Sequence, residues 1–438
     1  MPYDVMIGRI PTDKEKFGKE GTILLGKQYV KMGQVTSLSN EVLLDVSRSH
    51  VVFVCGKRGS GKSYTLGVIA EGIAALPEHI TQNLSVLIFD TMGIFWTMKY
   101  PNHKDEELLR EWNLEGKSLP IQLYTPIGFF KEFKDKGMPA DHAFAIDPSE
   151  LDPMDWCTTF SINPNEELGV FIIKIISELK KRKFSLPEII SAIKADVNAP
   201  NYIKDGAANR FSNAQSWGLF AEKSTAIKDL IAPGQTTVID LSPYATLPGA
   251  AGVRALVIGL ISQKLFEERM VARAGEEFEN VQEAVHYFSY EGPEKKEMPL
   301  VWLMVDEAHE FLPNVGKTTA TDALVTILRE GRQPGISLVL ASQQPGKIHT
   351  DVMTQADVVI AHRLTAKVDV DALGMLMQSY MRTSLDQQID NLPRVTGAAI
   401  VFDDINERMY PVRIRPRASW HGGEAPAALK EEKKLFEF

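Results

Sequence analysis

The feature that most restricts what this chain can fold into is a glycine-rich turn, GKRGSGKS, at residues 56–63. It fits the pattern G-x-x-x-x-G-K-[ST] in full and follows an apolar run, VVFVC, at residues 51–55. Such a run is typical of a strand buried on both faces, and residues 64–75 have the pattern of a helix packed on a sheet. A strand, this turn and a helix in succession predict a phosphate-binding loop.

The residue types of the turn explain how it would hold a nucleotide. Glycines let backbone N–H groups turn inward around phosphate oxygens, and the start of the following helix adds partial positive charge. We expect Lys62 to reach the β- and γ-phosphates and the Ser63 hydroxyl to ligate Mg²⁺. ATP contacts are assigned to nine residues: Gly56, Lys57, Arg58, Gly59, Ser60, Gly61, Lys62, Ser63 and Tyr64.

Two other glycine patterns in the sequence do not match a nucleotide-binding motif. A GKT triplet at 316–318 has Phe311 where the earlier glycine is required. The G-x-G at 59–61 would need a third glycine at Tyr64 to bind a dinucleotide. A chance glycine-rich turn remains the alternative to a phosphate loop.

Composition sets the broad class of the protein. A length of 438 residues allows one large α/β domain with insertions or two to three smaller domains. The sequence lacks a run of 18 apolar residues and a signal-peptide pattern, and its two cysteines, Cys55 and Cys157, form no disulfide framework. We therefore expect a cytoplasmic protein without a membrane segment. The net charge of −9 disfavours a general nucleic-acid coat but allows a ring with a small basic channel.

The order of apolar runs predicts the fold class. Besides 51–55, buried-strand patterns occur at 85–90, 236–241, 300–306, 336–341, 357–361 and 398–402, with helical patterns between most of them. Alternation of this kind predicts an α/β fold with a mostly parallel sheet. A helical stretch interrupts it, and residues 275–297 have the acidic, proline-bearing composition of an exposed loop. The expected organisation is an N-terminal β segment or reduced barrel (1–48), a first core part (49–147), a helical insertion (148–235), a second core part (236–412) and a C-terminal tail (413–438).

Two acidic residues end one of the buried runs. Asp306 at the tip of the strand is expected to hold the Mg²⁺ shell, and Glu307, one residue on, is placed to act as general base on the attacking water. A plain strand end is the alternative, as the similar pattern ending at Asp90 shows, but Asp90 lacks a following acid. The letters DEAH also occur in helicases with two tandem core domains, whereas only one core is evident here.

Three further residues are candidates for sensing the γ-phosphate. Gln343 follows the apolar run at 336–341, where it can contact the γ-phosphate or the water; a strand-ending glutamine before Pro345 is the alternative. Arg332 follows Gly331 at a helix end and is either a phosphate-sensing arginine or a surface residue. Arg48 precedes the first buried strand, at an edge that often faces a neighbouring subunit.

Taken together, these motifs resemble the HerA branch of the HerA/FtsK superfamily. The resemblance rests on DEAHEFLP at 306–313, REGRQPG at 329–335, LASQQP at 340–345 and RIRPRASWHGG at 413–423, and covers residues 45–423. It implies a RecA-like core in a homohexameric ring that binds ATP and Mg²⁺ at subunit interfaces. By this resemblance Gln343 is the sensor glutamine, Arg332 acts in cis, Arg48 acts in trans, and the C-terminal tail packs on the neighbouring subunit.

The resemblance also implies partners and activity. Members translocate on double-stranded DNA, and archaeal HerA works with the nuclease NurA on DNA ends. The N-terminal segment here is half the usual barrel length, which puts a NurA-like partner in doubt. We therefore expect a hexameric ATPase translocating on DNA in repair or defence. The alternatives are a ring ATPase that scaffolds or switches an effector protein, and a secretion motor.

Overall fold

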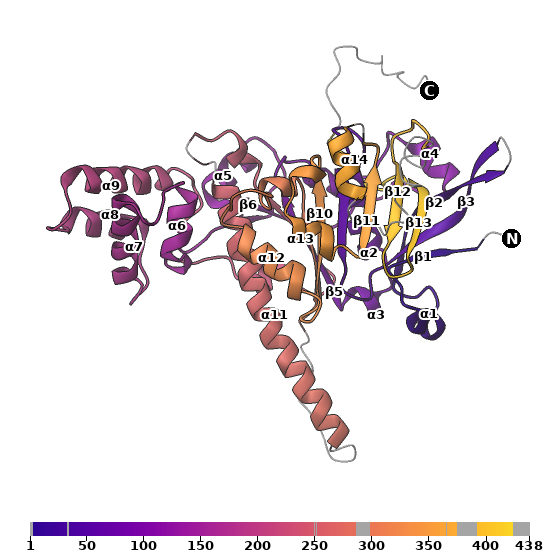
Figure 1. Cartoon of the computed structure of the whole chain (residues 1–438), viewed down its shortest axis with the longest axis horizontal. Helices are drawn as coiled ribbons and strands as arrows, with labels where there is room; N and C mark the ends of the chain where they lie inside the picture. Colours follow the sequence, from indigo (N-terminus) through magenta and orange to yellow (C-terminus); the bar gives the residue numbers. More distant parts are fainter. Residues whose placement is uncertain are drawn as a thin grey trace, which may run out of the picture.

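One continuous sheet organises the molecule (Figure 1). The computed structural model describes residues 3–423 apart from 33–34, 249, 251, 286–297, 365 and 375–391. The described strands form a 13-stranded sheet in the order β1-β3-β2-β13-β12-β11-β4-β10-β9-β5-β8-β6-β7. Their bounds are β1 Val5–Ile7, β2 Thr22–Met32, β3 Val35–Asp45, β4 Val51–Cys55, β5 Leu84–Asp90, β6 Ile121–Pro126, β7 His142–Phe144, β8 Thr236–Asp240, β9 Leu300–Val305, β10 Ile336–Ser342, β11 Val358–His362, β12 Ala398–Asp403 and β13 Arg408–Ile414.

The eight strands from β11 to β7 run parallel. These parallel strands all begin at one edge of the sheet, which we call the amino edge. They end at the opposite edge, which we call the carboxyl edge. All seven buried runs expected from the sequence are strands of this sheet, and six of them are parallel. The predicted α/β fold with a mostly parallel sheet is confirmed. Strands β6 and β7, at one end of the sheet, were not predicted; β7 has only three residues.

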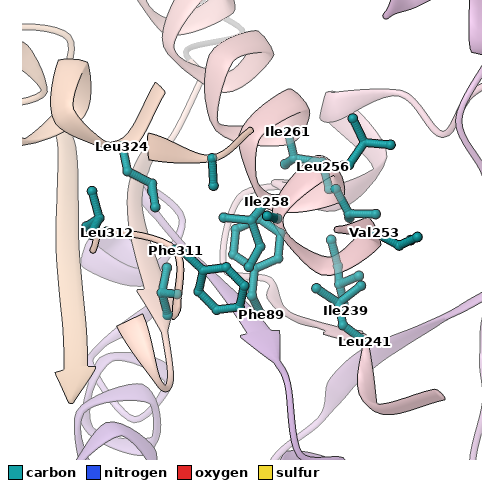
Figure 2. Packing of buried hydrophobic residues seen from close by; sticks show 14 of the residues in the cluster. Phe89, Ile239, Leu241, Val253, Leu256, Ile258, Ile261, Phe311, Leu312 and Leu324 are labelled. Carbon is teal, nitrogen blue, oxygen red and sulfur yellow. The ribbon is translucent and has the colours of Figure 1, made fainter. Parts of the chain in front are cut away.

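Both faces of the sheet are covered by helices, and alternating side chains supply the two cores. Ile88 belongs to one buried cluster, with helix α2, and Phe89 to the other, with helices α11 and α12. Figure 2 shows Phe89 and Ile239 packed against Val253 and Ile258 of α11. The helices are α1 Pro11–Phe17, α2 Lys62–Ala74, α3 Glu78–Thr81, α4 Glu106–Glu111, α5 Ile127–Asp135, α6 Pro153–Thr159, α7 Glu167–Leu179, α8 Leu186–Ala195, α9 Asn201–Gln215, α10 Ile227–Leu230, α11 Val253–Val285, α12 Thr321–Glu330, α13 Thr350–Gln355 and α14 Lys367–Gly374.

Helices α6 to α10 follow β7 and precede β8 in the sequence, and α6 to α9 form a lobe at one end of the sheet (Figure 1). Aromatic side chains hold this lobe together: the ring centroids of Trp156 and Phe211 are 4.9 Å apart, and those of Phe160 and Trp217 are 5.9 Å apart. Trp156 and Trp217 are fully buried. The buried side chains of these helices belong to the same hydrophobic cluster as those under α11.

The N-terminal strands extend the main sheet. β2 and β3 are 11 residues each, and β2 pairs with β13, which pairs with β12. A reduced barrel was expected here. Among the described residues these strands instead continue the sheet, because β13 occupies the edge of β2 that a barrel would use to close.

A second correction concerns residues 275–297. The acidic composition predicted an exposed loop, but residues 275–285 belong to α11, a helix of 33 residues. The remaining residues, 286–297, lie outside the described part of the chain. Within the described helices, α11 included, there is none that combines the length and the apolar character needed to cross a bilayer.

Candidate nucleotide-hydrolysis site

The phosphate loop follows β4 at the carboxyl edge and is held between two neighbouring strands. The Gly56 N–H donates to the Ser342 carbonyl at 3.3 Å, and the Lys57 N–H donates to the Arg363 carbonyl at 3.2 Å. A Cβ on Gly56 would lie 2.5 Å from Ser60 Oγ and 2.6 Å from His362 Cβ, so that any side chain would displace the loop. The loop thus requires glycine at this position for packing as well as for its backbone conformation.

Lys62 opens α2 with its side chain buried against the loop. Its Nζ donates to the Lys57 carbonyl at 3.2 Å. Burial lowers the pKa of Lys62, whereas the nearby carboxylates of Glu307 and Asp306 act in the opposite direction. A partly desolvated ammonium group enclosed by backbone gains strongly from anionic oxygens, so phosphate is a fitting counter-ion.

Ser63 and Asp306 meet directly beside the loop. Ser63 Oγ donates to Asp306 Oδ2 at 2.5 Å, and the Glu307 N–H donates to Asp306 Oδ1 at 2.8 Å. Burial raises the pKa of Asp306. A hydroxyl and a carboxylate oxygen are ligands of the type that Mg²⁺ takes in nucleotide sites, where waters and phosphate oxygens complete the shell. The donor set therefore fits the expected metal.

Glu307 has an uncommon backbone conformation. Its φ of +52° lies in the left-handed region, which glutamate rarely adopts and which costs on the order of 1–3 kcal/mol. Its Oε1 accepts a hydrogen bond from the Gln343 amide, and its Oε2 lies 3.6 Å from His309 Nδ1. Burial, and then the charge of Asp306, raises the pKa of Glu307. A carboxylate held in this way is well suited to accept a proton from water.

Gln343 lies directly after β10 and contacts the expected base. The structure therefore brings Lys62, Ser63, Asp306, Glu307 and Gln343 together at the carboxyl edge, as the sequence predicted. Their common position follows from β4, β9 and β10 being adjacent parallel strands. The amide hydrogen bond to Glu307 adds a role that the sequence did not show: Gln343 orients the carboxylate.

Arg332 lies at the other edge of the sheet. It is an exposed residue of the turn before β10, whose seven residues separate it from Gln343 by about 20 Å at 3.3 Å per residue. A cis role for Arg332 on the nucleotide of its own subunit is therefore wrong. The order of motifs along the chain was evident from the sequence, but the edge of the sheet that each motif reaches was not.

Arg48 lies at the same amino edge, before β4. Its Nη2 donates to Asp13 Oδ1 at 3.0 Å, while half of its side chain is exposed. Arg363 follows β11, is half-buried, and its backbone carbonyl accepts a hydrogen bond from the Lys57 N–H of the phosphate loop. Neither Arg363 nor His362 was singled out in the sequence. The short β11 pattern ending next to them was the available signal.

His362 closes the loop from the β11 side. It is buried, and its Nε2 lies 2.9 Å from Thr65 Oγ1 on α2. Burial lowers the pKa of His362 to about 4, so the ring is neutral at physiological pH. A neutral imidazole packs against the loop and forms a hydrogen bond without placing a second positive charge beside Lys62.

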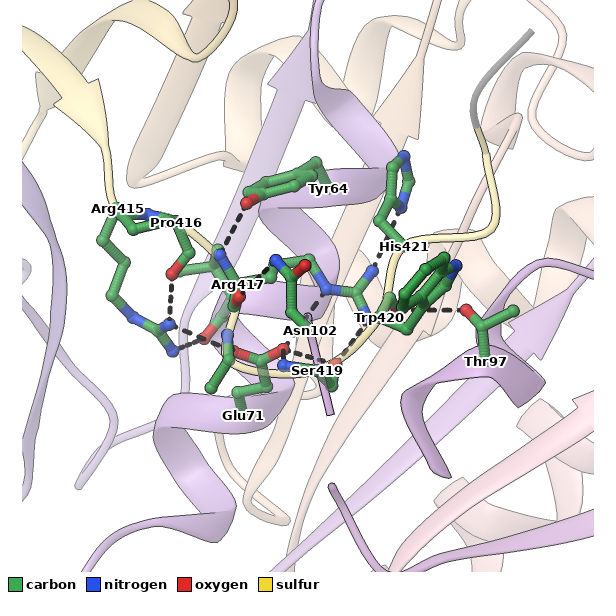
Figure 3. Close-up of polar contacts among 12 residues, drawn as sticks. Tyr64, Glu71, Thr97, Asn102, Arg415, Pro416, Arg417, Ser419, Trp420 and His421 are labelled. Atoms are coloured by element: carbon green, nitrogen blue, oxygen red, sulfur yellow. Dashed lines mark hydrogen bonds and ion pairs between the residues drawn. The ribbon is translucent and has the colours of Figure 1, made fainter. Parts of the chain in front are cut away.

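Residues 415–421 pack on the phosphate-loop helix of their own chain (Figure 3). The buried carboxylate of Glu71 on α2 accepts hydrogen bonds from Arg415 Nη1 at 3.0 Å, from Arg417 Nε at 3.2 Å and from Ser419 Oγ at 2.5 Å. The Arg417 N–H donates to the Tyr64 hydroxyl at 2.6 Å. Within the chain, Arg415 and Arg417 thus bond to a residue 344 and 346 positions earlier, while the packing of the tail on a neighbouring subunit stays a prediction.

The fold and the site together define a P-loop ATPase with a RecA-like core. Comparison with known proteins gives the family: the model described as "Helicase HerA, central domain" matches residues 30–261, more than half of the chain. The chain therefore belongs to the HerA family. The resemblance seen in its motifs is confirmed.

Individual relatives agree with this assignment. The chain is 31% identical over 192 residues to the DNA double-strand break repair helicase HerA of Pyrococcus furiosus, covering 42% of this chain and a third (33%) of that protein. It is 23% identical over 451 residues to the HerA of Sulfurisphaera tokodaii, covering 98% of this chain and 77% of that protein. The structure of VirB4 from Thermoanaerobacter pseudethanolicus is similar in fold, with a TM-score of 0.53 and 13% identity over 91% of this chain and 96% of that one.

Proposed function

We propose that this chain is the subunit of a homohexameric, ATP-driven motor that moves on double-stranded DNA. The observation that carries the proposal is the separation of Arg48 and Arg332 from the phosphate loop of their own chain. Two arginines at the amino edge are useful in hydrolysis only when a neighbouring copy brings its nucleotide to them. A closed ring gives every subunit such a neighbour.

The proposed chemistry follows from the side chains at the carboxyl edge. Lys62 and the loop N–H groups bind the phosphates, and Glu307, oriented by Gln343, takes the proton of the attacking water. Arg363 acts in cis in place of Arg332, while Arg332 or Arg48 of the neighbour stabilises the charge that develops on the γ-phosphate. Mg²⁺ held by Ser63 and Asp306 would neutralise charge on the β- and γ-phosphates.

Support for DNA as the track comes from the relatives that are named as DNA repair helicases. A nuclease, NurA-like or otherwise, or another effector is the proposed partner, and the cytoplasm the proposed location, where the buried thiols of Cys55 and Cys157 stay reduced. The net charge of −9 favours a second candidate: a ring ATPase that switches an effector protein without travelling on DNA.

Mass and turnover measurements test both candidates. A motor on DNA should form a hexamer in solution and hydrolyse ATP several-fold faster with linear duplex DNA, and Lys62→Ala should abolish turnover in a folded protein. If the protein is a hexamer but linear duplex DNA does not raise its ATPase rate, the effector switch would be favoured. A monomer under all conditions, with and without ATP and DNA, would contradict both.

A further inference from the structure

The two oxygens of the Glu307 carboxylate differ in their hydrogen bonds. Gln343 donates to Oε1, whereas Oε2 is buried and has no hydrogen-bond donor within the part of the chain that the structure describes. A buried carboxylate oxygen without a donor costs free energy, and the terminal torsion of a glutamate side chain is soft. The contacts described above therefore orient the proposed base at one oxygen only.

His309 lies beside the second oxygen. Its Nδ1 is 3.6 Å from Glu307 Oε2 and 3.3 Å from Ser342 Oγ. The imidazole is largely shielded, with 16% of its side chain exposed, and burial lowers the pKa of His309, so that the ring is neutral near pH 7. A neutral imidazole has a single N–H to donate. In the tautomer that carries this proton on Nδ1, the ring can donate toward the carboxylate.

A turn directly after β9 brings the two side chains together. The strand ends at Val305, Glu307 has its φ of +52°, and residues 308–310 form a short 3₁₀ helix whose first residue, Ala308, is buried in the core. A strand continued past Val305 would keep the side chains at 307 and 309 about 6.6 Å apart, at about 3.3 Å per residue. The strained backbone of Glu307 is therefore part of the turn that places His309 next to its carboxylate.

Ser342, the last residue of β10, connects His309 to the rest of the site. Its hydroxyl lies next to the imidazole and accepts a hydrogen bond from the Gln344 N–H at 3.1 Å. Its carbonyl accepts the hydrogen bond from Gly56 of the phosphate loop, and Gln343, the next residue in the chain, donates to Glu307. The imidazole and the amide that face the two carboxylate oxygens are thus both tied to the end of β10, which also holds the phosphate loop.

We propose that His309 is a positioning residue for Glu307: when ATP binds, its Nδ1–H donates to Oε2, so that the carboxylate is held at both oxygens and faces the attacking water. Catalytic hydrogen bonds commonly shorten when the substrate binds, and a small movement of either side chain brings 3.6 Å to hydrogen-bond length. A carboxylate has about four lone-pair positions, so that others remain for the water. The inference rests on the proposed role of Glu307 as the base.

Steady-state ATPase kinetics of the full chain with three substitutions of His309 test the inference. The amide of asparagine can take the place of Nδ1 and that of glutamine the place of Nε2, so His309→Asn keeps the donor that faces Glu307. His309→Ala and His309→Gln should lower kcat by roughly ten- to a hundredfold, since a misplacement of about 1 Å can cost about a hundredfold. KM for ATP and the melting temperature should change little, and His309→Asn should restore most of the rate. His103→Ala, which removes an exposed histidine paired with Glu106, is the control and should leave kcat unchanged.

A double variant separates this inference from the role of the base itself. Glu307→Gln has no carboxylate to orient, so adding His309→Ala should lower its residual single-turnover rate by less than about twofold. A further loss of about tenfold in the double variant, or loss of ATP binding in His309→Ala, would show that His309 acts apart from Glu307 and would overturn the inference.

Two other results of the same measurements would also overturn it: a normal kcat in His309→Ala while Glu307→Gln is inactive, or a His309→Asn variant as slow as the alanine variant. Normal turnover by Glu307→Gln would contradict the proposed base, and the inference with it.

Discussion

The two edges of the parallel sheet differ in whether one chain supplies all the groups of a functional site. At the carboxyl edge, Ser63 bonds to Asp306 and Gln343 bonds to Glu307, while the buried Lys62 is held by the phosphate loop near the two carboxylates. At the amino edge the functional candidates are exposed and lie far from any phosphate loop of their own chain. The carboxyl edge thus has the form of an active site, and the amino edge has the form of a surface for other molecules.

In the proposed ring, this difference locates the cooperation between subunits. Binding of ATP would depend on groups that one chain supplies, whereas stabilisation of the transition-state charge would also depend on an arginine at the amino edge of the neighbour. Variants at the two edges should therefore fail in different ways.

The largest expected effect is at the carboxyl edge. Glu307→Gln keeps size and hydrogen-bonding capacity but removes the base, so turnover should fall by at least about a hundredfold while ATP still binds. Single-turnover hydrolysis and nucleotide binding check this. Glu310→Gln, on the same turn but paired with Arg254 at 2.7 Å, is the matched control and should hydrolyse ATP normally. Near-normal turnover by Glu307→Gln would remove Glu307 from its role.

The sharpest test of the comparison mixes subunits. Arg332→Ala should lower turnover by at least about a hundredfold, because arginine fingers contribute roughly 10³–10⁵ to the rate. Lys62→Ala subunits retain Arg332 but cannot use ATP. When Arg332→Ala subunits are mixed with them, ATPase activity should recover, because Arg332 of a Lys62→Ala subunit then faces the phosphate loop of an Arg332→Ala subunit.

Arg363→Ala mixed with Lys62→Ala should stay inactive, since a cis arginine cannot be supplied by a neighbour. Arg329→Ala, which removes an ion pair of 2.6 Å with Asp351, should cost little. Recovery in the Arg363 mixture, or its absence in the Arg332 mixture, would reverse the assignment of the two edges.

The buried ion pairs of the tail should contribute more to the free energy of unfolding than exposed ion pairs on the surface. Removing one partner from a buried charge cluster costs about 3–5 kcal/mol, so Arg417→Met should lower the free energy of unfolding by roughly that amount in denaturant titrations. Arg182→Met breaks an exposed pair with Glu188 and should cost less than about 1 kcal/mol. Similar losses for both variants would show that the tail cluster contributes no more than a surface ion pair.

The smallest effect concerns pH. Asp90 and Asp240 end adjacent strands at the carboxyl edge, and burial together with the charge of Asp240 raises the pKa of Asp90 to about 7. Since the folded state then binds more protons than the unfolded state between about pH 4 and 7, stability should fall as pH rises through this window. Asp240→Asn should reduce that fall by on the order of 1 kcal/mol. An unchanged pH dependence would show that the two carboxylates do not interact.

Much of the carboxyl edge was predictable from the sequence. The phosphate loop, Asp306 and Gln343 each follow an apolar run, and parallel strands bring the residues after such runs to one edge. Arg332 was misplaced because a residue before a strand reaches the opposite edge from one after it. The extent of α11 was missed because Gly275 and several glutamates have the composition of a loop, although the helix tolerates them. The partner of Arg417 was unpredictable, since Glu71 carries no local sign of it.

The cluster around Glu71 has a consequence for how the protein is made. Glu71 lies on the helix that begins in the phosphate loop, and its partner Arg415 follows 344 residues later. At about 5–20 residues per second, a ribosome needs roughly 20–70 s to cover that distance. During this interval the Glu71 carboxylate stays in water, because the arginines that bind it have not been made. Burial of this face of α2 therefore comes only after the last strand and residues 415–419 have left the ribosome.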